Sequence, residues 1–250
     1  MPTLRDGSTV EDLRLDRLVH FDEKSREYNI RQVLAPDATP VTKLWDIPAT
    51  ADQTILNQGR EGACTGFGST NELRFNPIAV VRDTGAGLDY TFAREHVYWE
   101  AQKIDPWPGG AYPGASPQYE GTSVLAAVKR MQALGFYTEY RWAFGERDLA
   151  LTIGNVGPAI LGLNWYQGMF KPNSRGYIRP TGAVQGGHCI LCIGYNAQYR
   201  YYTLYNSWGP TWGNKGTAKV SAADMVTLLA DNGEACVVTG RTVPVGFKAV

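Results

Sequence analysis

The sequence is poor in cysteine and histidine, with four and three residues respectively in a chain of 250. Four cysteines are too few for the disulfide framework of a small secreted domain. Cys189 and Cys192 form a single C-x-x-C pair, and no second pair completes a zinc site. On a strand their side chains point to opposite faces and cannot easily bond to each other. We therefore interpret Cys189, Cys192 and Cys236 as small buried hydrophobic residues and expect no metal ion and no cofactor.

Excess charge of either sign is also absent, because 24 Lys and Arg residues balance 24 Asp and Glu residues. Such a chain lacks the basic footprint that attracts nucleic acids or anionic membranes. No apolar run approaches the ~20 residues of a membrane-spanning helix, and residues 1–7 lack the pattern of a signal peptide. We expect a soluble, cytoplasmic protein that binds neither nucleic acid nor membrane, unless an unconventional route exports it.

The most informative stretch is Asn57–Gly68, in which Gln58 precedes Cys64 by six residues. Glycines ahead of Cys64 allow a sharp turn, and the apolar residues that follow, with no proline before Pro77, predict a helix from Cys64 to Phe75. At a helix N-terminus the unsatisfied N–H groups and the positive end of the dipole favour the thiolate. The thiolate is the form of cysteine that attacks carbonyl groups, and it needs a partner base.

A second stretch supplies that base. Residues 186–195 predict a buried strand that is entered through two glycines and carries His188. The chain then turns and resumes as a strand from Tyr201, which leads into Asn206-Ser207-Trp208-Gly209. A hairpin of this kind brings Asn206 beside His188.

Three motifs, taken in order, resemble the signature of papain-like cysteine peptidases. They are Gln58 ahead of Cys64, Gly187-His188 on a strand, and Asn206-Ser207-Trp208-Gly209. His188 and Asn206 follow Cys64 by 124 and 142 residues, close to the spacing typical of that family. Gly121-Thr122-Ser123 resembles the segment that lines its substrate cleft. The resemblance implies an α+β, papain-like two-lobed fold, in which a helical lobe with the nucleophile helix faces an antiparallel, barrel-like sheet lobe across the active-site cleft.

The periodicity of apolar residues agrees with a division into a helical lobe and a sheet lobe. Helices are predicted for residues 90–103 and 124–135, and strands dominate from Thr152 onwards, before a short helix at 225–230 and a closing strand at 235–239. The loop of residues 105–119 is rich in proline and glycine, and it either stands over the cleft or is a rigid surface loop.

The resemblance also implies a role for each site residue. Cys64 is the expected nucleophile, His188 its base, Asn206 the residue that orients the imidazole, and Gln58 an oxyanion-hole donor. The positions expected to bind substrate are Gly121, Thr122, Gly162, Gly186, Gly187, Cys189 and Trp208. Of these, the pocket of Gly162, Gly186 and Cys189 is expected to be open and mostly apolar, with a preference for a large hydrophobic side chain at the second residue before the cleaved bond.

Two positions depart from the family pattern. Thr65 replaces the aromatic residue that commonly follows the nucleophile, and Gly187 stands where plant enzymes often carry a polar residue. The leading hypothesis is hydrolysis of peptide bonds in a peptide or protein substrate through a thioester. The alternatives are an acyl transferase or amidase with the same catalytic residues, and an inactive binding protein, which the intact catalytic set disfavours.

Residues 1–42 form an N-terminal extension ahead of the peptidase domain expected at 43–250. Leucine, valine and phenylalanine alternate there with charged residues, so the extension is able to pack against the domain. It is shorter than the helical prosegments of family members and lacks their pattern. A structural arm is therefore favoured over an inhibitory segment that contacts the cleft.

Overall fold

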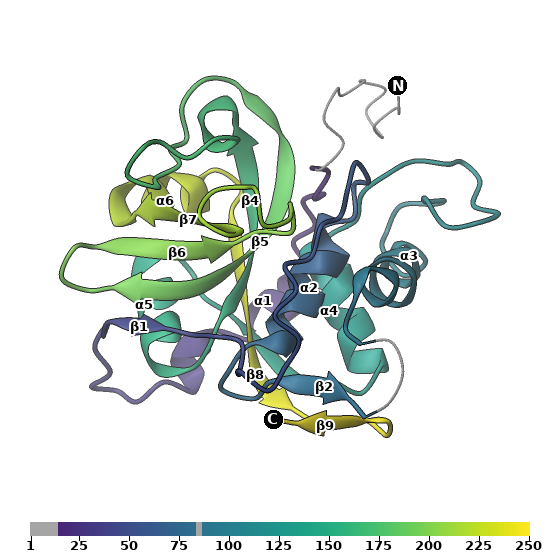
Figure 1. Cartoon of the computed structure of the whole chain (residues 1–250), viewed down its shortest axis with the longest axis horizontal. Coiled ribbons are helices and arrows are strands. Elements are labelled where there is room, and N and C mark those ends of the chain that lie inside the picture. The colour runs from purple at the N-terminus through teal and green to yellow at the C-terminus, as the bar shows by residue number, and fades with distance from the viewer. Residues whose placement is uncertain (1–14, 84–86) are drawn as a thin grey trace.

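Helices dominate the first part of the chain and strands the second. The computed structural model describes residues 15–83 and 87–250 and shows two lobes side by side, one mainly helical and one built on a sheet (Figure 1). The helices are α1 (Glu23–Arg26), η1 (Ile30–Gln32), α2 (Cys64–Arg74), the π-helix η2 (Phe92–Tyr98), α3 (Trp99–Gln102), α4 (Val124–Ala133), α5 (Glu146–Asn155), η3 (Gln167–Met169) and α6 (Ala222–Ala230).

The strands are short except for three that run through the middle of the sheet. They are β1 (Lys43–Leu44), β2 (Val80–Arg82), β3 (Tyr137–Trp142), β4 (Ala159–Tyr166), β5 (Val184–Asn196), β6 (Tyr201–Tyr205), β7 (Thr217–Ser221), β8 (Glu234–Arg241) and β9 (Phe247–Ala249). The main sheet is antiparallel in the order β3-β8-β4-β5-β6-β7, with β1 paired to β5. Within the described residues it does not close into a barrel, contrary to the barrel-like lobe expected from sequence.

Helix α2 is the central element of the helical lobe, and all eleven of its residues are buried. Two glycines allow the close packing that this burial needs. A Cβ atom on Gly66 would lie 2.4 Å from the Ala93 carbonyl oxygen, and one on Gly68 would lie 2.7 Å from the sulfur of Cys189 on β5. These glycines therefore let α2 wedge between η2 and the sheet, which places its first residue in the interface between the lobes.

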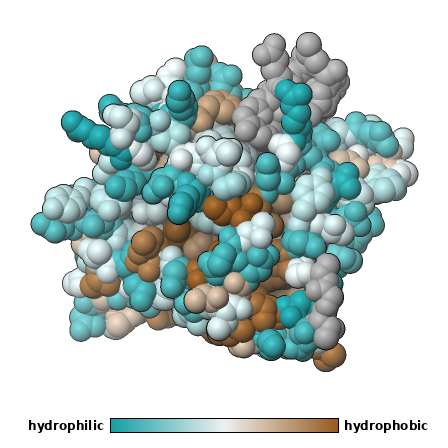
Figure 2. Space-filling view, in the orientation of Figure 1, coloured by the Kyte–Doolittle hydropathy of each residue, from teal (hydrophilic) through white to brown (hydrophobic). Residues whose placement is uncertain are grey.

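Strand β5 divides the hydrophobic interior into two cores. Cys189 and Leu191 pack into the core shared with the helical lobe, whereas Ile190 and Cys192 pack into the core on the other face of the sheet. The two cysteines thus point to opposite faces, as their spacing predicts. Both are free thiols, as are Cys64 and Cys236. On the face of the molecule in Figure 2, apolar surface gathers along the seam between the lobes.

The described part of the N-terminal extension crosses from the cleft to the sheet lobe. We call residues 15–42 the arm. The Asp22 side chain caps α1, and the Ser25 hydroxyl of α1 lies 3.1 Å from that of Tyr140 on β3. Further on, Ile30 is fully buried in the core of the sheet lobe. This portion of the arm therefore contributes to the fold itself.

Several predicted elements have the expected place, and others were missed. The predicted helix at 90–103 is formed by η2 and α3, and residues 105–119 are irregular as predicted. β3 and α5 were not predicted, and α5 includes Thr152, the residue from which strands were expected to dominate. No helix in residues 15–83 and 87–250 is long and apolar enough to cross a membrane.

Candidate active site

Cys64 is the first residue of α2 and is fully buried. Ala63 precedes it as the N-cap and offers no side-chain hydrogen bond, so the helix N-terminus is open towards the thiol. The Cys64 Sγ donates to the Leu15 carbonyl oxygen of the arm at 3.7 Å. Burial raises the pKa of the Cys64 thiol to about 12, although a backbone hydrogen bond with Cys189 opposes the rise. Desolvation is the largest of the causes that act on this thiol, and it favours the neutral form over the thiolate.

His188 and Asn206 lie in contact on the facing wall. His188 Nε2 and Asn206 Oδ1 are 2.8 Å apart, and the Ser207 backbone N–H donates to the same oxygen at 2.9 Å. Two donors on one atom identify it as the amide oxygen, so His188 Nε2 carries the hydrogen and Nδ1 carries the lone pair. The rings of Trp165 and Trp208 each lie 4.7 Å from the imidazole. They exclude water from the His188–Asn206 hydrogen bond.

The Gln58 side chain joins the two walls. Its Oε1 accepts from the Ser207 hydroxyl at 2.7 Å, and its Nε2 donates to the Glu61 carbonyl oxygen at 2.9 Å. The Gln58 backbone N–H also donates to the Ser207 carbonyl oxygen at 2.9 Å. These bonds fix the orientation of a fully buried amide next to the loop that carries Asn206.

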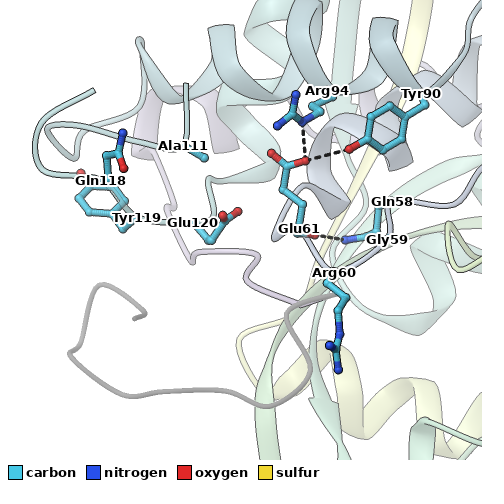
Figure 3. A pocket seen from close by; sticks show the side chains of 10 residues that line it. All are labelled: Gln58, Gly59, Arg60, Glu61, Tyr90, Arg94, Ala111, Gln118, Tyr119 and Glu120. Atoms are coloured by element: carbon cyan, nitrogen blue, oxygen red, sulfur yellow. Dashed lines mark hydrogen bonds and ion pairs between the residues drawn. The ribbon is translucent and has the colours of Figure 1, made fainter. Parts of the chain in front are cut away.

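A cavity of about 620 Å³ opens on the helical side of Gln58 (Figure 3). Glu61 lies in its wall and accepts hydrogen bonds from Arg94 at 2.6 Å and from the Tyr90 hydroxyl at 3.3 Å. Glu120 lies across the cavity, and burial raises the pKa of its carboxyl group. This cavity provides room for a ligand beside Gln58 and carries both acidic and basic groups.

The arm runs through the cleft between the two walls. The Arg17 backbone N–H donates to the Gly187 carbonyl oxygen at 2.9 Å, and the Leu18 N–H donates to the Thr122 carbonyl oxygen at the same distance. Arg17 forms a parallel bridge with Thr122. Together with the contact of Leu15 to Cys64, these bonds place the arm against positions that were predicted to bind substrate.

Three glycines of the predicted substrate site approach the arm closely. A Cβ atom would lie 2.0 Å from the Arg17 carbonyl oxygen at Gly187, 2.4 Å from the Asp16 carbonyl oxygen at Gly121, and 2.4 Å from Arg17 Nε at Gly162. Any side chain at these positions would displace the arm. Of the remaining predicted positions, Gly186 faces Leu15, and Cys189 packs against α2 behind the cleft.

One charged residue of the pocket was not predicted. Glu234, the first residue of β8, pairs with Gly162 in the sheet register, and its carboxylate Oε1 lies 3.3 Å from Arg17 Nε. Both side chains are almost fully buried. From the sequence we expected a mostly apolar pocket here, without this carboxylate. Trp165 was omitted as well, and no local pattern marks either residue, because only the sheet register brings them to the site.

Comparison with known proteins complements this geometry. A family model described as "Papain family cysteine protease" matches residues 91–237, more than half of the chain. The chain belongs to the papain family of cysteine proteases. The matched span of this papain-family protein includes His188 and Asn206 and begins after Gln58 and Cys64.

Two relatives illustrate the extent of the similarity. Cathepsin K of Mus musculus is 27% identical over 184 residues, which cover 66% of this chain and 54% of the cathepsin. A cathepsin B-like cysteine proteinase of Schistosoma japonicum is 36% identical over 89 residues, or 34% of this chain and 25% of the relative. The chain of this papain-family protein thus spans about half or less of the length of these curated relatives.

Solved structures of the family share the fold. Xylellain, a cysteine protease from Xylella fastidiosa, superposes with a TM-score of 0.66 at 15% identity, over 93% of this chain and 98% of that one. Digestive procathepsin L2 from Tenebrio molitor larval midgut gives a TM-score of 0.51 at 19% identity, over 89% and 77%. The predicted papain-like α+β fold is confirmed. Within the described ranges of the papain-family protein, no group of three or more His, Cys, Asp and Glu side chains could hold a metal ion.

Proposed function

We propose that this protein is a cysteine peptidase with Cys64 as nucleophile, and that the arm holds it in an inactive state. The observation that carries the proposal is the hydrogen bond of 2.8 Å between His188 Nε2 and Asn206 Oδ1 under Trp208. It leaves the lone pair on Nδ1, the nitrogen needed by a general base. The Cys64 thiol also has a hydrogen bond to the backbone of Cys189, the residue after His188. This contact supports a position of the sulfur close to the imidazole ring.

The reaction proceeds in two stages once a substrate replaces the arm. His188 Nδ1 takes the proton of Cys64, and the thiolate adds to the substrate carbonyl carbon. Gln58 Nε2 and the Cys64 backbone N–H donate to the oxyanion that forms. As the C–N bond breaks, His188 passes the proton to the leaving amine and a thioester remains. Water, deprotonated by His188, then hydrolyses the thioester and restores the thiol.

Occupation of the cleft by the arm supports the proposed inactive state. The Leu15 carbonyl accepts from Cys64, and burial raises the pKa of this thiol to about 12. A buried neutral thiol is a poor nucleophile, and the peptide above it excludes substrate. The arm thus has two functions, since its later residues pack on the sheet lobe. Deleting residues 1–42 would remove the buried Ile30 as well as the inhibitory contact, so a point substitution is the cleaner test.

The test uses an epoxide inhibitor that alkylates papain-like thiolates, with intact-mass spectrometry of the full chain. Arg17→Ala removes an anchor of the arm and leaves the catalytic side chains intact. We expect one adduct per chain in Arg17→Ala, slow or absent labelling of the wild type, and hydrolysis of a denatured protein substrate by Arg17→Ala. The matched control is Arg17→Ala combined with Cys64→Ala, in which both signals should vanish. Adducts that persist in this control, or a labelled protein that cleaves no peptide bond, would contradict the proposal.

A further inference from the structure

Another cavity, of about 560 Å³, lies on the sheet lobe and is lined by none of the catalytic or predicted substrate-binding residues. Its walls come from the loop of residues 171–176, from β6 and β7, and from the turn that follows Trp208. We call this cavity the basic pocket. It is defined by three cationic and three uncharged polar residues, which are Lys171, Arg175, Lys219, Thr203, Thr211 and Asn214.

The positive charges of the basic pocket have no acidic partner. No lining residue is an aspartate or a glutamate, although the whole chain has a net charge of zero. Within the part of the chain that the structure describes, no carboxylate lies within ion-pair distance of Lys171, Arg175 or Lys219, whereas Arg179 pairs with Asp224 at 3.5 Å. Like charges in one pocket repel one another, and an anion that enters the pocket offsets this repulsion. The basic pocket therefore favours an anionic ligand.

Hydrogen bonds hold the loop that forms one wall of the basic pocket. Asn173 Oδ1 accepts from two backbone N–H groups of this loop, that of Arg175 at 2.9 Å and that of Tyr177 at 3.0 Å. The loop is also bound to β7, because the Lys219 N–H donates to the Gly176 carbonyl oxygen at 2.8 Å. A wall whose backbone is already fixed loses little conformational entropy when a ligand binds. The basic pocket is thus formed before the ligand arrives.

The three cations of the basic pocket differ in how firmly they are held. The Lys219 ammonium group lies 5.8 Å from the centre of the Tyr177 ring and 4.9 Å from that of the Tyr201 ring. The two rings meet edge to face, with their centres 6.0 Å apart. Such cation–π contacts fix the position of the Lys219 charge. Lys171 and Arg175 are exposed, so their longer side chains are able to turn towards a ligand.

The size and the uncharged polar groups of the basic pocket narrow the class of ligand. A volume of about 560 Å³ is in the range of cavities that bind small molecules. Thr203, Thr211 and Asn214 supply hydroxyl and amide groups that both donate and accept, which suits the hydroxyl groups of a sugar. Guanidinium and ammonium groups bind the oxygens of phosphate and sulfate. A hydroxyl-rich molecule with several such oxyanions matches both sets of groups.

We propose that the basic pocket binds a sugar or similar polyol that carries at least two phosphate or sulfate ester groups. Lys171, Arg175 and Lys219 hold the oxyanions, and the threonine and asparagine side chains bind the hydroxyl groups of the carrier. The two esters share the chemistry of a tetrahedral oxyanion, so the experiment compares one phosphate ester with one sulfate ester. Such binding uses no step of the proposed peptide hydrolysis.

Isothermal titration calorimetry of the full chain tests the proposal with fructose 1,6-bisphosphate, sucrose octasulfate, inorganic phosphate and unmodified fructose. We expect at least one of the two esters to bind about 10-fold or more tightly than inorganic phosphate, because several oxyanions on one carrier contact several cations. Lys171→Ala and Arg175→Ala should each weaken that binding about 10-fold, since each removes one charge-assisted contact. The matched control is Arg147→Ala, which removes an exposed arginine of α5 outside the pocket and should change the affinity by about 2-fold or less.

The outcomes divide clearly. Ester binding that both pocket variants weaken and Arg147→Ala keeps supports the proposal, and the tighter of the two esters identifies phosphate or sulfate as the oxyanion. Binding of the esters no tighter than that of inorganic phosphate or of unmodified fructose overturns it. The proposal also fails if Lys171→Ala and Arg175→Ala bind as the wild type does, or if Arg147→Ala loses as much affinity as they do. Because Lys171 and Arg175 are exposed, both variants should keep the thermal unfolding midpoint of the wild type.

Discussion

Releasing the arm should change the reactivity of Cys64 by an amount that the structure sets. Burial raises the pKa of this thiol from 9.0 to about 12 in the arm-bound state. Return to the ordinary value in Arg17→Ala would increase the thiolate fraction near neutral pH by roughly 1000-fold. A less basic thiolate is also a weaker nucleophile, which offsets part of this increase and leaves a gain of about 30-fold or more. Iodoacetamide labelling, followed by intact mass between pH 6 and about pH 10, measures this rate.

Binding of the arm should also depend on pH, in a direction that the thiol pKa sets. Because the raised pKa means that the arm-bound state holds the thiol proton more tightly, arm binding is fully favoured below the ordinary thiol pKa of 9.0. Arm binding weakens as the pH rises from 9.0 through about 12. The wild-type labelling rate should therefore climb steadily across the alkaline range, whereas that of Arg17→Ala should level off at lower pH.

Two results would refute this reasoning. Labelling of Arg17→Ala as slow and as steeply pH-dependent as that of the wild type would mean that the arm does not set the protonation of Cys64. An equal acceleration in Arg31→Ala would mean that general loosening of the arm, and not release of Arg17 from Glu234, exposes the thiol. The Arg31–Asp148 pair, at 2.5 Å, lies on the sheet lobe, so Arg31→Ala tests the second possibility directly.

Three further predictions concern the catalytic residues and the fold. In the Arg17→Ala background, Asn206→Ala should lower kcat roughly 100-fold, because the imidazole loses the acceptor that orients it; unchanged kcat in peptide hydrolysis would exclude that role. Gln58→Ala should lower kcat by roughly 100-fold with little change in KM, and a change confined to KM would indicate ground-state binding instead. Ile30→Ala in the wild-type chain should reduce the free energy of unfolding by about 2–4 kcal/mol in urea denaturation; a loss near zero would show that this part of the arm is not integral to the core.

Local sequence signals located the elements that carry their own patterns. The helix that begins at Cys64 was predicted one residue longer than α2, and the strand of His188 was predicted from its apolar run after two glycines. The hairpin geometry also predicted that Asn206 would meet His188. Each of these depends on residues close together in the chain, where turn chemistry and periodicity decide the structure.

Elements stabilised mainly by distant contacts were missed. β3 carries alternating aromatic, charged and polar residues, and its identity as a strand follows from pairing with β8. α5 contains Thr152 and Ile153, which favour strands locally, yet Leu149 and Ile153 are buried in the sheet-lobe core. In both cases tertiary packing overrides weak local preferences.

The sequence by itself determined the chemical groups available to the site and the order in which the chain presents them: a cysteine at a helix N-terminus, a histidine on a strand and an asparagine after the next strand. The tertiary structure alone decided the state of those groups. Cys64 is fully buried beneath the Leu15 carbonyl group of the arm, and burial raises the pKa of its thiol. The buried carboxylate of Glu234 has a cationic partner because Arg17, 217 residues away in the chain, lies 3.3 Å from it. Desolvation and charge pairing depend on everything within a few ångströms of an atom, and neighbours in space are not encoded by neighbours in sequence.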